Sequence, residues 1–414
     1  MVREEFLFAQ LLTNNGDTGM DEVRSIIFQL LKESLFPDLY KESALTGGFN
    51  WKDVFLEMQQ QTVDMLPGEW LKKNSISDLS LQEKWIERCT LQKGCWVQVM
   101  YEQTELLNLL EENGIKSVII KGAAAAMAYP QPSLRSVGDI DFLVSRVDYE
   151  KAARLLEENG YLLLGEKDKD FYHYKYTKNR VIFELHRRLA IIPETDEKLI
   201  SLFEDGINHR KTKRVGAFMF PVLPSKLNGL VLIFHINQHL RSGLVLRHII
   251  DWMMYLNERG GMQDLMPLLK KTKMERLANT ITVLCQRYLG LREFVPDFEE
   301  YPCEQLMEYI FTHGNFGRKS ANEGKISSVV LVSTNPVLLF RRLQKGGMLR
   351  WKAARKHKIL QPIAWVYQVG RIIRQLFRNR ITPIKFIKLQ KIGEEQRDLI
   401  LDLGLDIDRT IKEI

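Results

Sequence analysis

The stretch SVGDIDFLV, residues 136–144, decides the fold prediction, because it has the pattern of a strand that carries two acidic side chains. Successive side chains of a strand point to opposite faces, so Asp139 and Asp141 share one face, about 7 Å apart along the backbone. Ile140 points to the other face, into a core, and we expect Leu143 to join it. An isolated Asp-x-Asp is more often a solvated strand face, so the neighbouring elements decide the interpretation.

Those neighbours predict a compact α/β unit around the acidic strand. A β-branched run precedes it, followed by a small-residue helix, and an amphipathic helix and a strand pair come after it. We place the turn of the strand pair at Lys178-Asn179. The segments are SVII (117–120), AAAAMAYP (123–130), DYEKAARLLEENGY (148–161), FYHYKY (171–176) and RVIFELHRRL (180–189). The sequence therefore predicts an α+β fold with a small mixed sheet, flanked by N-terminal and C-terminal helical regions.

Two further motifs place candidate site residues beside the paired carboxylates. Lys121-Gly122 lies between a strand and a helix, where glycine allows close approach and free backbone N–H groups can receive a phosphate. Downstream, Glu184 and His186 share one face of their strand, and Glu184 can ligate a metal or take a proton from an attacking hydroxyl. Hard oxygen ligands suit Mg²⁺, and paired metals can stabilise both oxygens in phosphoryl transfer. Each motif alone is commonly structural.

Together, the run IIKGAAAAMAYP…LRSVGDIDFLVSRVDYEKAARLLEENGY…VIFELHRRL resembles a large, poorly characterised bacterial nucleotidyltransferase family. The pattern of that family is Lys-Gly, then Arg…Asp-x-Asp, a helix ending in Gly-Tyr, and a strand with Glu-x-His. The family belongs to the DNA polymerase β-like nucleotidyltransferase superfamily. The resemblance is close over about residues 115–190. One departure from the wider superfamily is Lys-Gly-Ala in place of Gly-Ser or Gly-Gly after the first strand.

The resemblance implies a site and a reaction. Asp139, Asp141 and Glu184 would be the catalytic triad and would hold Mg²⁺ or Mn²⁺. Nucleotide-binding residues would be Lys121, Gly122, Arg135 and His186, with Arg135 facing the phosphates. An acceptor hydroxyl would attack the α-phosphate of a nucleoside triphosphate (NTP), ATP among the candidates, and pyrophosphate would leave. The acceptor (a small molecule, a sugar, a protein or an RNA end) and the preferred base stay open.

The chain of 414 residues divides by texture into four expected parts. They are an N-terminal helical region (1–113), the nucleotidyltransferase domain (114–222), a helical substrate domain (223–330) and a basic C-terminal helical region (331–414). Helical periodicity is clearest over 22–36, 81–114, 227–240 and 245–258. Asn113-Gly114 is a typical helix stop.

Composition indicates an ordinary globular protein with a modest basic excess. The net charge is +7, but residues 341–391 hold fifteen Lys or Arg and no Asp or Glu. This basic segment suits an anionic partner, RNA or a membrane surface, although a solvated face of a packed helical domain is the preferred interpretation. The four cysteines form no Cys-x-x-Cys pair, and no signal peptide or transmembrane stretch is recognisable, so a cytoplasmic location is expected.

Several histidines remain candidates without an assigned role. His235 and His239 are four residues apart on a predicted helix and so share a face, which is metal-ligand spacing. The zinc-protease pattern is absent because Ile236 stands where glutamate is required. The family resemblance places this helix where the second domain packs, so a polar lining of the substrate cleft is the preferred interpretation. His173, among aromatic residues, is expected in a cross-strand cluster, and His313 before a glycine-containing turn receives no role.

Three functional hypotheses follow. Metal-dependent transfer of a nucleoside monophosphate is preferred. The alternative is a non-catalytic module in which the basic helices bind RNA or a membrane and the triad is vestigial. A third is kinase-like transfer of the γ-phosphoryl group with the same metals. The presence of all three carboxylates argues against a vestigial site.

Overall fold

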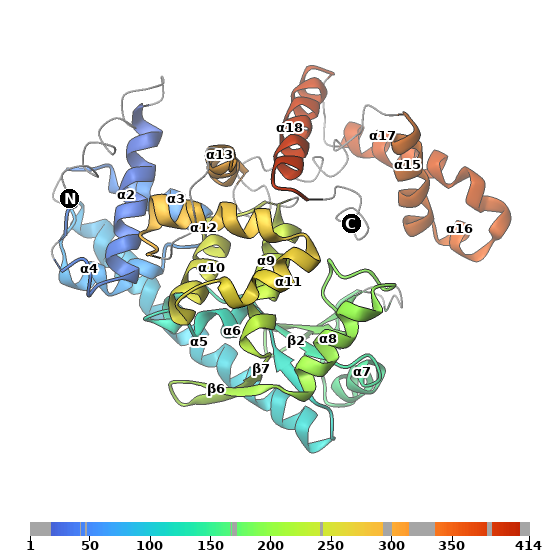
Figure 1. Ribbon diagram of the computed structural model, residues 1–414, viewed down its shortest axis with the longest axis horizontal. Helices are drawn as coiled ribbons and strands as arrows, with labels where there is room; N and C mark the ends of the chain where they lie inside the picture. Colours follow the sequence, from blue (N-terminus) through green and yellow to red (C-terminus); the bar gives the residue numbers. More distant parts are fainter. Residues whose placement is uncertain are drawn as a thin grey trace.

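We analysed a computed structural model of the chain. It describes residues 18–41, 43–45, 48–165, 167, 172–240, 243–292, 300–313, 336–378 and 383–405. A mixed sheet forms the lower half of the view in Figure 1, and helices from distant parts of the sequence form a layer above it. The long helix α5 crosses the sheet on the other side and contacts β1 and β7. The predicted α+β architecture, with helical regions at both ends, is confirmed.

The sheet has seven strands in the spatial order β3-β4-β5-β2-β1-β7-β6. Strand β2 lies at its centre, parallel to β5 and antiparallel to β1, and β1 is parallel to β7. The strands are β1 (Ser117–Ile119), β2 (Asp139–Val144), β3 (Leu162–Leu163), β4 (His173–Lys178), β5 (Val181–His186), β6 (Lys211–Val215) and β7 (Phe218–Val222).

The helices account for most of the remaining described residues. They are α2 (Thr18–Leu35), α3 (Trp51–Gln60), α4 (Trp70–Lys73), α5 (Leu79–Glu112), α6 (Gly122–Ala126), α7 (Tyr149–Glu158), α8 (Glu197–Asn208), α9 (Ser225–His239), α10 (Leu246–Arg259), α11 (Met266–Thr272), α12 (Glu275–Leu289), α13 (Cys303–His313), α15 (Pro336–Arg350), α16 (Lys352–Lys356), α17 (Ala364–Arg378) and α18 (Pro383–Asp402). Short 3₁₀ turns, η1 (Leu66–Gly68), η2 (Pro132–Leu134), η3 (Gln263–Leu265) and η5 (Lys358–Ile363), connect some of them. The helices predicted from periodicity, α2, α5, α9 and α10, are all present.

The two faces of the sheet belong to two different cores. Ile140, Phe183 and Leu185 pack with the second half of α5 and with α7. Leu143 instead joins the larger core that holds α8 and α9. The expectation that Leu143 shares a face with Ile140 is therefore wrong, because odd-numbered residues of β2 point to the face that Asp141 occupies. The site carboxylates consequently face the helical layer.

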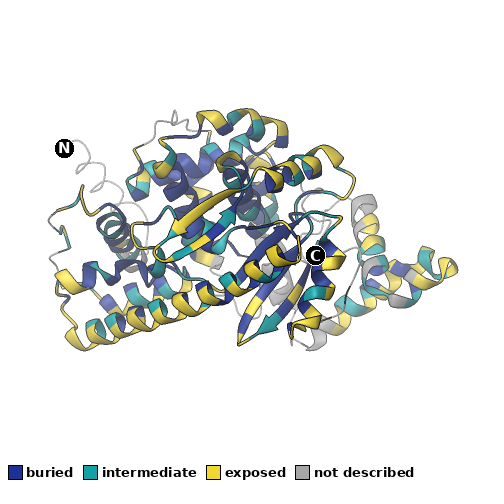
Figure 2. Ribbon diagram, turned by 90° about the horizontal axis from the view of Figure 1, so that it is seen from below, coloured by how far each residue is buried: buried dark blue, intermediate teal, exposed yellow. Residues whose placement is uncertain are grey.

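The larger core joins segments that the sequence analysis places in separate parts. Buried residues of α2, α3 and the first half of α5 pack with α9, α10, α12, α13 and the end of α18. Figure 2 shows this buried interior, while the outer side of the long helix α5 is exposed. Helices α15, α16 and α17 pack mainly on one another. The N-terminal helices thus stabilise the helical layer above the sheet.

The hairpin between β4 and β5 turns one residue later than predicted. Asn179 and Arg180 both have positive φ, 50° and 66°, which is the signature of a two-residue type I′ turn. The side chain of Asn179 donates a hydrogen bond to Glu102 of α5 over 2.8 Å. This turn sets the register in which Lys175 lies opposite Glu184.

Strands β6 and β7 extend the sheet where the sequence analysis predicts no strand. Residues 211–214 of β6 are all exposed and therefore show no hydrophobic alternation. Pro221, which cannot donate to a ladder, lies within β7 and argues against a strand. Helix α8 was also not predicted.

None of the helices in the described ranges combines the length and the apolar character that a bilayer crossing requires. The glycine-containing turn expected after His313 lies outside the described residues.

Candidate active site

Adjacent parallel strands bring the central acidic residues together. Asp141 of β2 lies directly opposite Glu184 of β5, and His186 lies two residues further along the same strand. All three are buried, with exposed fractions of 4%, 8% and 1%. Their ligating atoms lie within 4.8 Å of one another, which is close enough for a shared metal ion. Glu184 and His186 therefore share a face of β5, as predicted, and that face also holds Asp141.

Cationic side chains surround these carboxylates. Nζ of Lys121 lies 2.7 Å from Oδ1 of Asp141, and Nε2 of His186 lies 2.9 Å from the same oxygen. Nε2 of His186 is also 3.4 Å from Oε2 of Glu184. The other carboxylate oxygen of Glu184, Oε1, pairs with Lys175 across the hairpin. Each cation occupies a lone pair that a metal would use, so metal binding has to displace some of these contacts.

The local charges favour the ionised forms of Lys121, His186 and Glu184. Burial alone would lower the pKa of Lys121 and of His186, but the neighbouring carboxylates raise both above their usual values. For Glu184, burial would raise the pKa, yet the hydrogen bond and charge of His186, with the charge of Lys121, lower it overall. A buried carboxylate that stays ionised is a suitable ligand for a hard cation.

The pKa of Asp139 is shifted in the opposite direction from that of Glu184. Asp139 begins β2 and is partly buried. The negative charge of Asp141, its own burial and the charge of Glu184 raise the pKa of Asp139 to about 6. At Asp139 the repulsion from Asp141 and Glu184 therefore outweighs the attraction to Lys121, and a divalent cation there would relieve this repulsion.

Lys121 has an unusual backbone conformation. It caps α6 with φ 54° and ψ −135°, a backbone conformation that residues other than glycine rarely adopt. Its carbonyl accepts the hydrogen bond of Ala125 over 2.8 Å. Gly122 follows with φ +20°, and a Cβ there would lie 3.5 Å from the carbonyl oxygen of Asp139. The strain is maintained at the point where the ammonium meets Asp141, which is typical of functional sites.

Lys121 also lies between two hollows. One is lined by Tyr172, His186, His235 and Gln238 among others. The other, of about 770 Å³, opens between α6, β6, β7, α9 and α10. Its basic lining residues besides Lys121 are Lys211, Lys213 and Arg259. An anionic substrate group can therefore be received next to the carboxylate cluster.

Comparison with known proteins agrees with this geometry. Residues 48–290, more than half of the chain, match the model of a family described as uncharacterised nucleotidyltransferase. The chain belongs to this nucleotidyltransferase family. No curated protein matches it. The family assignment supports a transferase of nucleotidyl groups in general, and the matched range contains every predicted site residue.

Arg135 forms an ion pair that the sequence analysis does not predict. Its guanidinium is buried and forms a bidentate pair with Asp251 of α10, at 2.8 Å (Nε–Oδ1) and 2.7 Å (Nη2–Oδ2). The hydroxyl of Tyr129 donates to the same carboxylate over 2.7 Å. These contacts favour a role in joining the sheet unit to α10, and a contact with phosphates stays a prediction.

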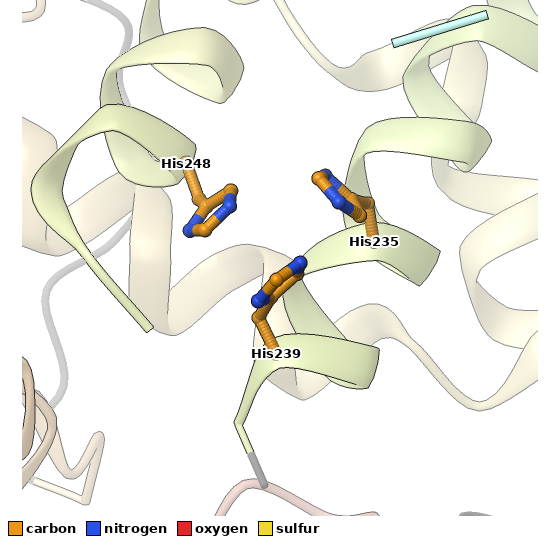
Figure 3. Close-up of side chains that lie close together, drawn as sticks. All are labelled: His235, His239 and His248. Atoms are coloured by element: carbon orange, nitrogen blue, oxygen red, sulfur yellow. The ribbon is translucent and has the colours of Figure 1, made fainter. Parts of the chain in front are cut away.

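Five of the histidines form two groups. His173 lies opposite His186, with ring centroids 5.2 Å apart and the rings stacked, as expected for a cross-strand cluster. His235 and His239 share a face of α9, as predicted, and His248 of α10 joins them (Figure 3). The sequence pattern missed this third member, because no helical spacing connects it with the other two.

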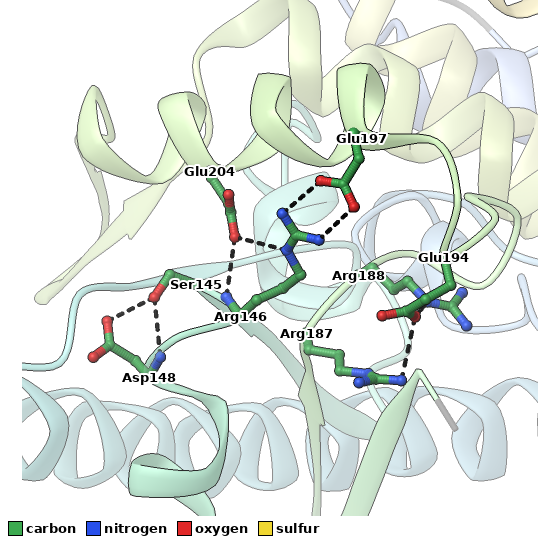
Figure 4. Close-up of polar contacts among 8 residues, drawn as sticks. All are labelled: Ser145, Arg146, Asp148, Arg187, Arg188, Glu194, Glu197 and Glu204. Carbon is green, nitrogen blue, oxygen red and sulfur yellow. Dashed lines mark hydrogen bonds and ion pairs between the residues drawn. The ribbon is translucent and has the colours of Figure 1, made fainter. Parts of the chain in front are cut away.

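The far ends of the two site strands are tied to neighbouring segments (Figure 4). Arg146, two residues after β2, pairs with Glu197 and Glu204 of α8 at 2.9 Å and 3.2 Å. Arg188, two residues after β5, pairs with Glu194 at 2.7 Å. Partly exposed pairs of this kind contribute little energy each, but they fix the direction in which the chain leaves the sheet.

Proposed function

We propose that this protein is a metal-dependent nucleotidyltransferase that moves a nucleoside monophosphate from an NTP to a hydroxyl acceptor and releases pyrophosphate. The observation that carries the proposal is the carboxylate cluster on adjacent strands, with Asp141 opposite Glu184 and Asp139 on the same strand. It lies within the segment that matches the nucleotidyltransferase family. We also infer that the family belongs to the DNA polymerase β-like superfamily.

The donor set fits Mg²⁺ or Mn²⁺. Carboxylate oxygens are the ligands that these ions prefer, and Asp139, Asp141 and Glu184 would hold them. The raised pKa of Asp139 is consistent with this fit, because its largest cause is the charge of Asp141 and a divalent cation between the two carboxylates would offset that repulsion. A divalent cation there supplies charge stabilisation for the transferred phosphoryl group.

The surrounding residues would bind and orient the nucleotide. Lys121 would exchange its contact with Asp141 for the triphosphate, and Gly122 leaves room for that approach. The hollow between α6, β6, β7, α9 and α10, with its lysines and Arg259, has the charge to attract a nucleotide. His186 would remain a donor beside the carboxylates. Placement and electrostatic stabilisation would contribute most of the rate enhancement, as in phosphoryl transfer generally.

The proposal is tested by transfer of label. Purified protein is incubated with each of the four NTPs labelled on the α-phosphate, with Mg²⁺ or Mn²⁺ and lysate of the host cell. An Asp139→Asn/Asp141→Asn variant and an Asp205→Asn control, which changes an exposed aspartate of α8, run in parallel. We expect label on an acceptor with the wild type and the control only. Equal labelling by the double variant would reject the site.

The alternative, a binding module that uses the basic helices, is not favoured. The family match includes the carboxylate cluster and ends at residue 290, before the basic segment 341–391. That segment is left as a candidate for contact with an anionic acceptor.

A further inference from the structure

We propose that His235, His239 and His248 form a second metal site, which takes a transition-metal ion of the Zn²⁺ class through three imidazole nitrogens. Their ligand atoms lie within 4.8 Å of one another. This site is separate from the carboxylate cluster and does not depend on the proposed transfer reaction.

The geometry of two packed helices brings the three rings around one space (Figure 3). Ring centroids are 4.5 Å apart for His235 and His239, 5.0 Å for His235 and His248, and 4.3 Å for His239 and His248. The two helices approach closely because residue 229 is glycine: a Cβ there would lie 2.4 Å from the hydroxyl oxygen of Tyr255. Tetrahedral Zn²⁺ places ligand nitrogens about 3.3 Å apart, so the rings need only a small inward rotation.

A hydrogen bond orients one of the rings, that of His239, for coordination. Nδ1 of His239 lies 3.3 Å from the carbonyl oxygen of Gly243, so this nitrogen carries the proton and Nε2 has the lone pair. Zinc-binding histidines commonly donate their other N–H to a backbone carbonyl in this way.

His248 supplies the second, independent observation. It is 1% exposed, and its Nε2 has no hydrogen-bond partner among the described residues. A buried polar atom without a partner is unfavourable, and coordination would satisfy it. Binding through Nε2 moves the ring proton to Nδ1 and gives up the long contact, 3.4 Å, from the Val245 amide. One weak hydrogen bond is thus exchanged for a metal–nitrogen bond.

The local electrostatics keep the rings in the form that binds metals. Burial lowers the pKa of all three, for His239 to about 4, so the imidazoles are neutral at physiological pH. Neutral imidazole suits Zn²⁺, Co²⁺ and Cu²⁺, whereas Mg²⁺ requires oxygen ligands. The charges of Lys121 and Arg247 reach this cluster, which favours an anionic fourth ligand.

His235 gives the site a position next to the substrate. It also lines a hollow together with Lys121 and His186. A three-histidine site with an open fourth position is therefore placed beside the proposed transfer site.

The test measures metal binding directly. Full-length protein is stripped with a chelator and titrated with Zn²⁺ alone by calorimetry, and with Co²⁺ while the visible absorption of tetrahedral coordination is followed. The variants are His248→Gln and, as an independent replacement on the other helix, His235→Gln. Controls are His209→Gln, an exposed histidine of similar chemistry, and Asp141→Asn/Glu184→Gln, which removes the carboxylate cluster.

We expect tight binding of one Zn²⁺ in the wild type and in both controls. The affinity should be at least tenfold lower in His248→Gln and in His235→Gln. The tetrahedral Co²⁺ spectrum should disappear in the same two histidine variants. Absence of Zn²⁺ binding in the wild type would overturn the proposal. So would binding that survives both histidine replacements and is lost in Asp141→Asn/Glu184→Gln.

Discussion

Replacement of Asp139 by asparagine should stabilise the metal-free protein. The raised pKa means that ionised Asp139 is repelled by Asp141 and Glu184, and asparagine removes this charge at nearly constant shape. A shift from 3.8 to about 6 corresponds to roughly 3 kcal/mol at pH 7.5. Below pH 3.8 the carboxyl is protonated in both folded and unfolded states, so the unfavourable contribution is absent there. It develops as the pH rises towards 6 and is complete above it.

The assay is thermal unfolding in chelator across this pH range. We expect the transition of Asp139→Asn to lie several degrees above that of the wild type at pH 7.5. The difference in unfolding free energy should shrink to about 1 kcal/mol at pH 4.5, because both proteins then carry little charge at residue 139. Addition of Mg²⁺ should stabilise the wild type and leave the variant nearly unchanged, because binding to the folded state raises its stability.

Glu184→Gln is the matched control with the opposite sign. The lowered pKa of Glu184 means that its ionised form stabilises the fold, an effect present above the ordinary pKa of glutamate and lost as the pH falls below it. This variant should therefore be less stable than the wild type at pH 7.5. An Asp139→Asn protein that is destabilised in chelator at pH 7.5, or whose gain is the same at pH 4.5, would refute the electrostatic reasoning.

Three further predictions concern the same region. Because the backbone of Lys121 is strained, Lys121→Gly should be more stable than Lys121→Ala by about 1–3 kcal/mol in chemical denaturation, although both lose the ammonium; equal stability would contradict it. Arg135→Met leaves the buried charge of Asp251 without a cationic partner and should lower the free energy of unfolding by about 3–5 kcal/mol. The double variant with Asp251→Leu should recover part of this loss. A loss below about 1 kcal/mol in the single variant, as for an exposed ion pair, would show that the pair is unimportant. Mg²⁺ affinity, measured by calorimetry, should fall up to about tenfold per pH unit below pH 6 because the proton on Asp139 competes with the metal, and a flat profile would exclude this competition.

The local elements of the site could be predicted because their patterns are periodic. The alternation in β2 places Asp139 and Asp141 on one face and Ile140 in a core, as the structure shows. The helices on both sides of the strand have clear amphipathic patterns and ends. Assignments of this kind depend on neighbours within a few residues, and these are visible in one sequence.

The hairpin turn was predicted one residue too early, so Lys175 was not identified as the residue opposite Glu184. With the turn at Asn179-Arg180, Glu184 lies opposite Lys175, as observed. A turn placed at residues 178–179 would set His173 opposite Glu184 instead. Register depends on turn geometry, and the positive φ values of Asn179 and Arg180 are not evident from residue types alone, since glycine is more usual there.

Long-range contacts were the other limit. Arg135 meets Asp251 because α10 packs on the sheet unit, and His248 meets His239 because α10 packs on α9. No spacing in the sequence encodes these meetings. The charged, proline-containing strands β6 and β7 were missed because their position beside β1 in the sheet overrides weak local preference.

The central claim, nucleotidyl rather than phosphoryl transfer at the carboxylate cluster, is tested most directly with paired labels. The same NTP is supplied with label on either the α- or the γ-phosphate, with Mg²⁺ and lysate, and both the acceptor and the released products are analysed. We predict that α-label moves to the acceptor, that γ-label is released as pyrophosphate, and that Asp139→Asn/Asp141→Asn abolishes both. Transfer of γ-label to the acceptor would instead show a kinase, and α-label transfer that persists in the double variant would contradict the assignment of the site.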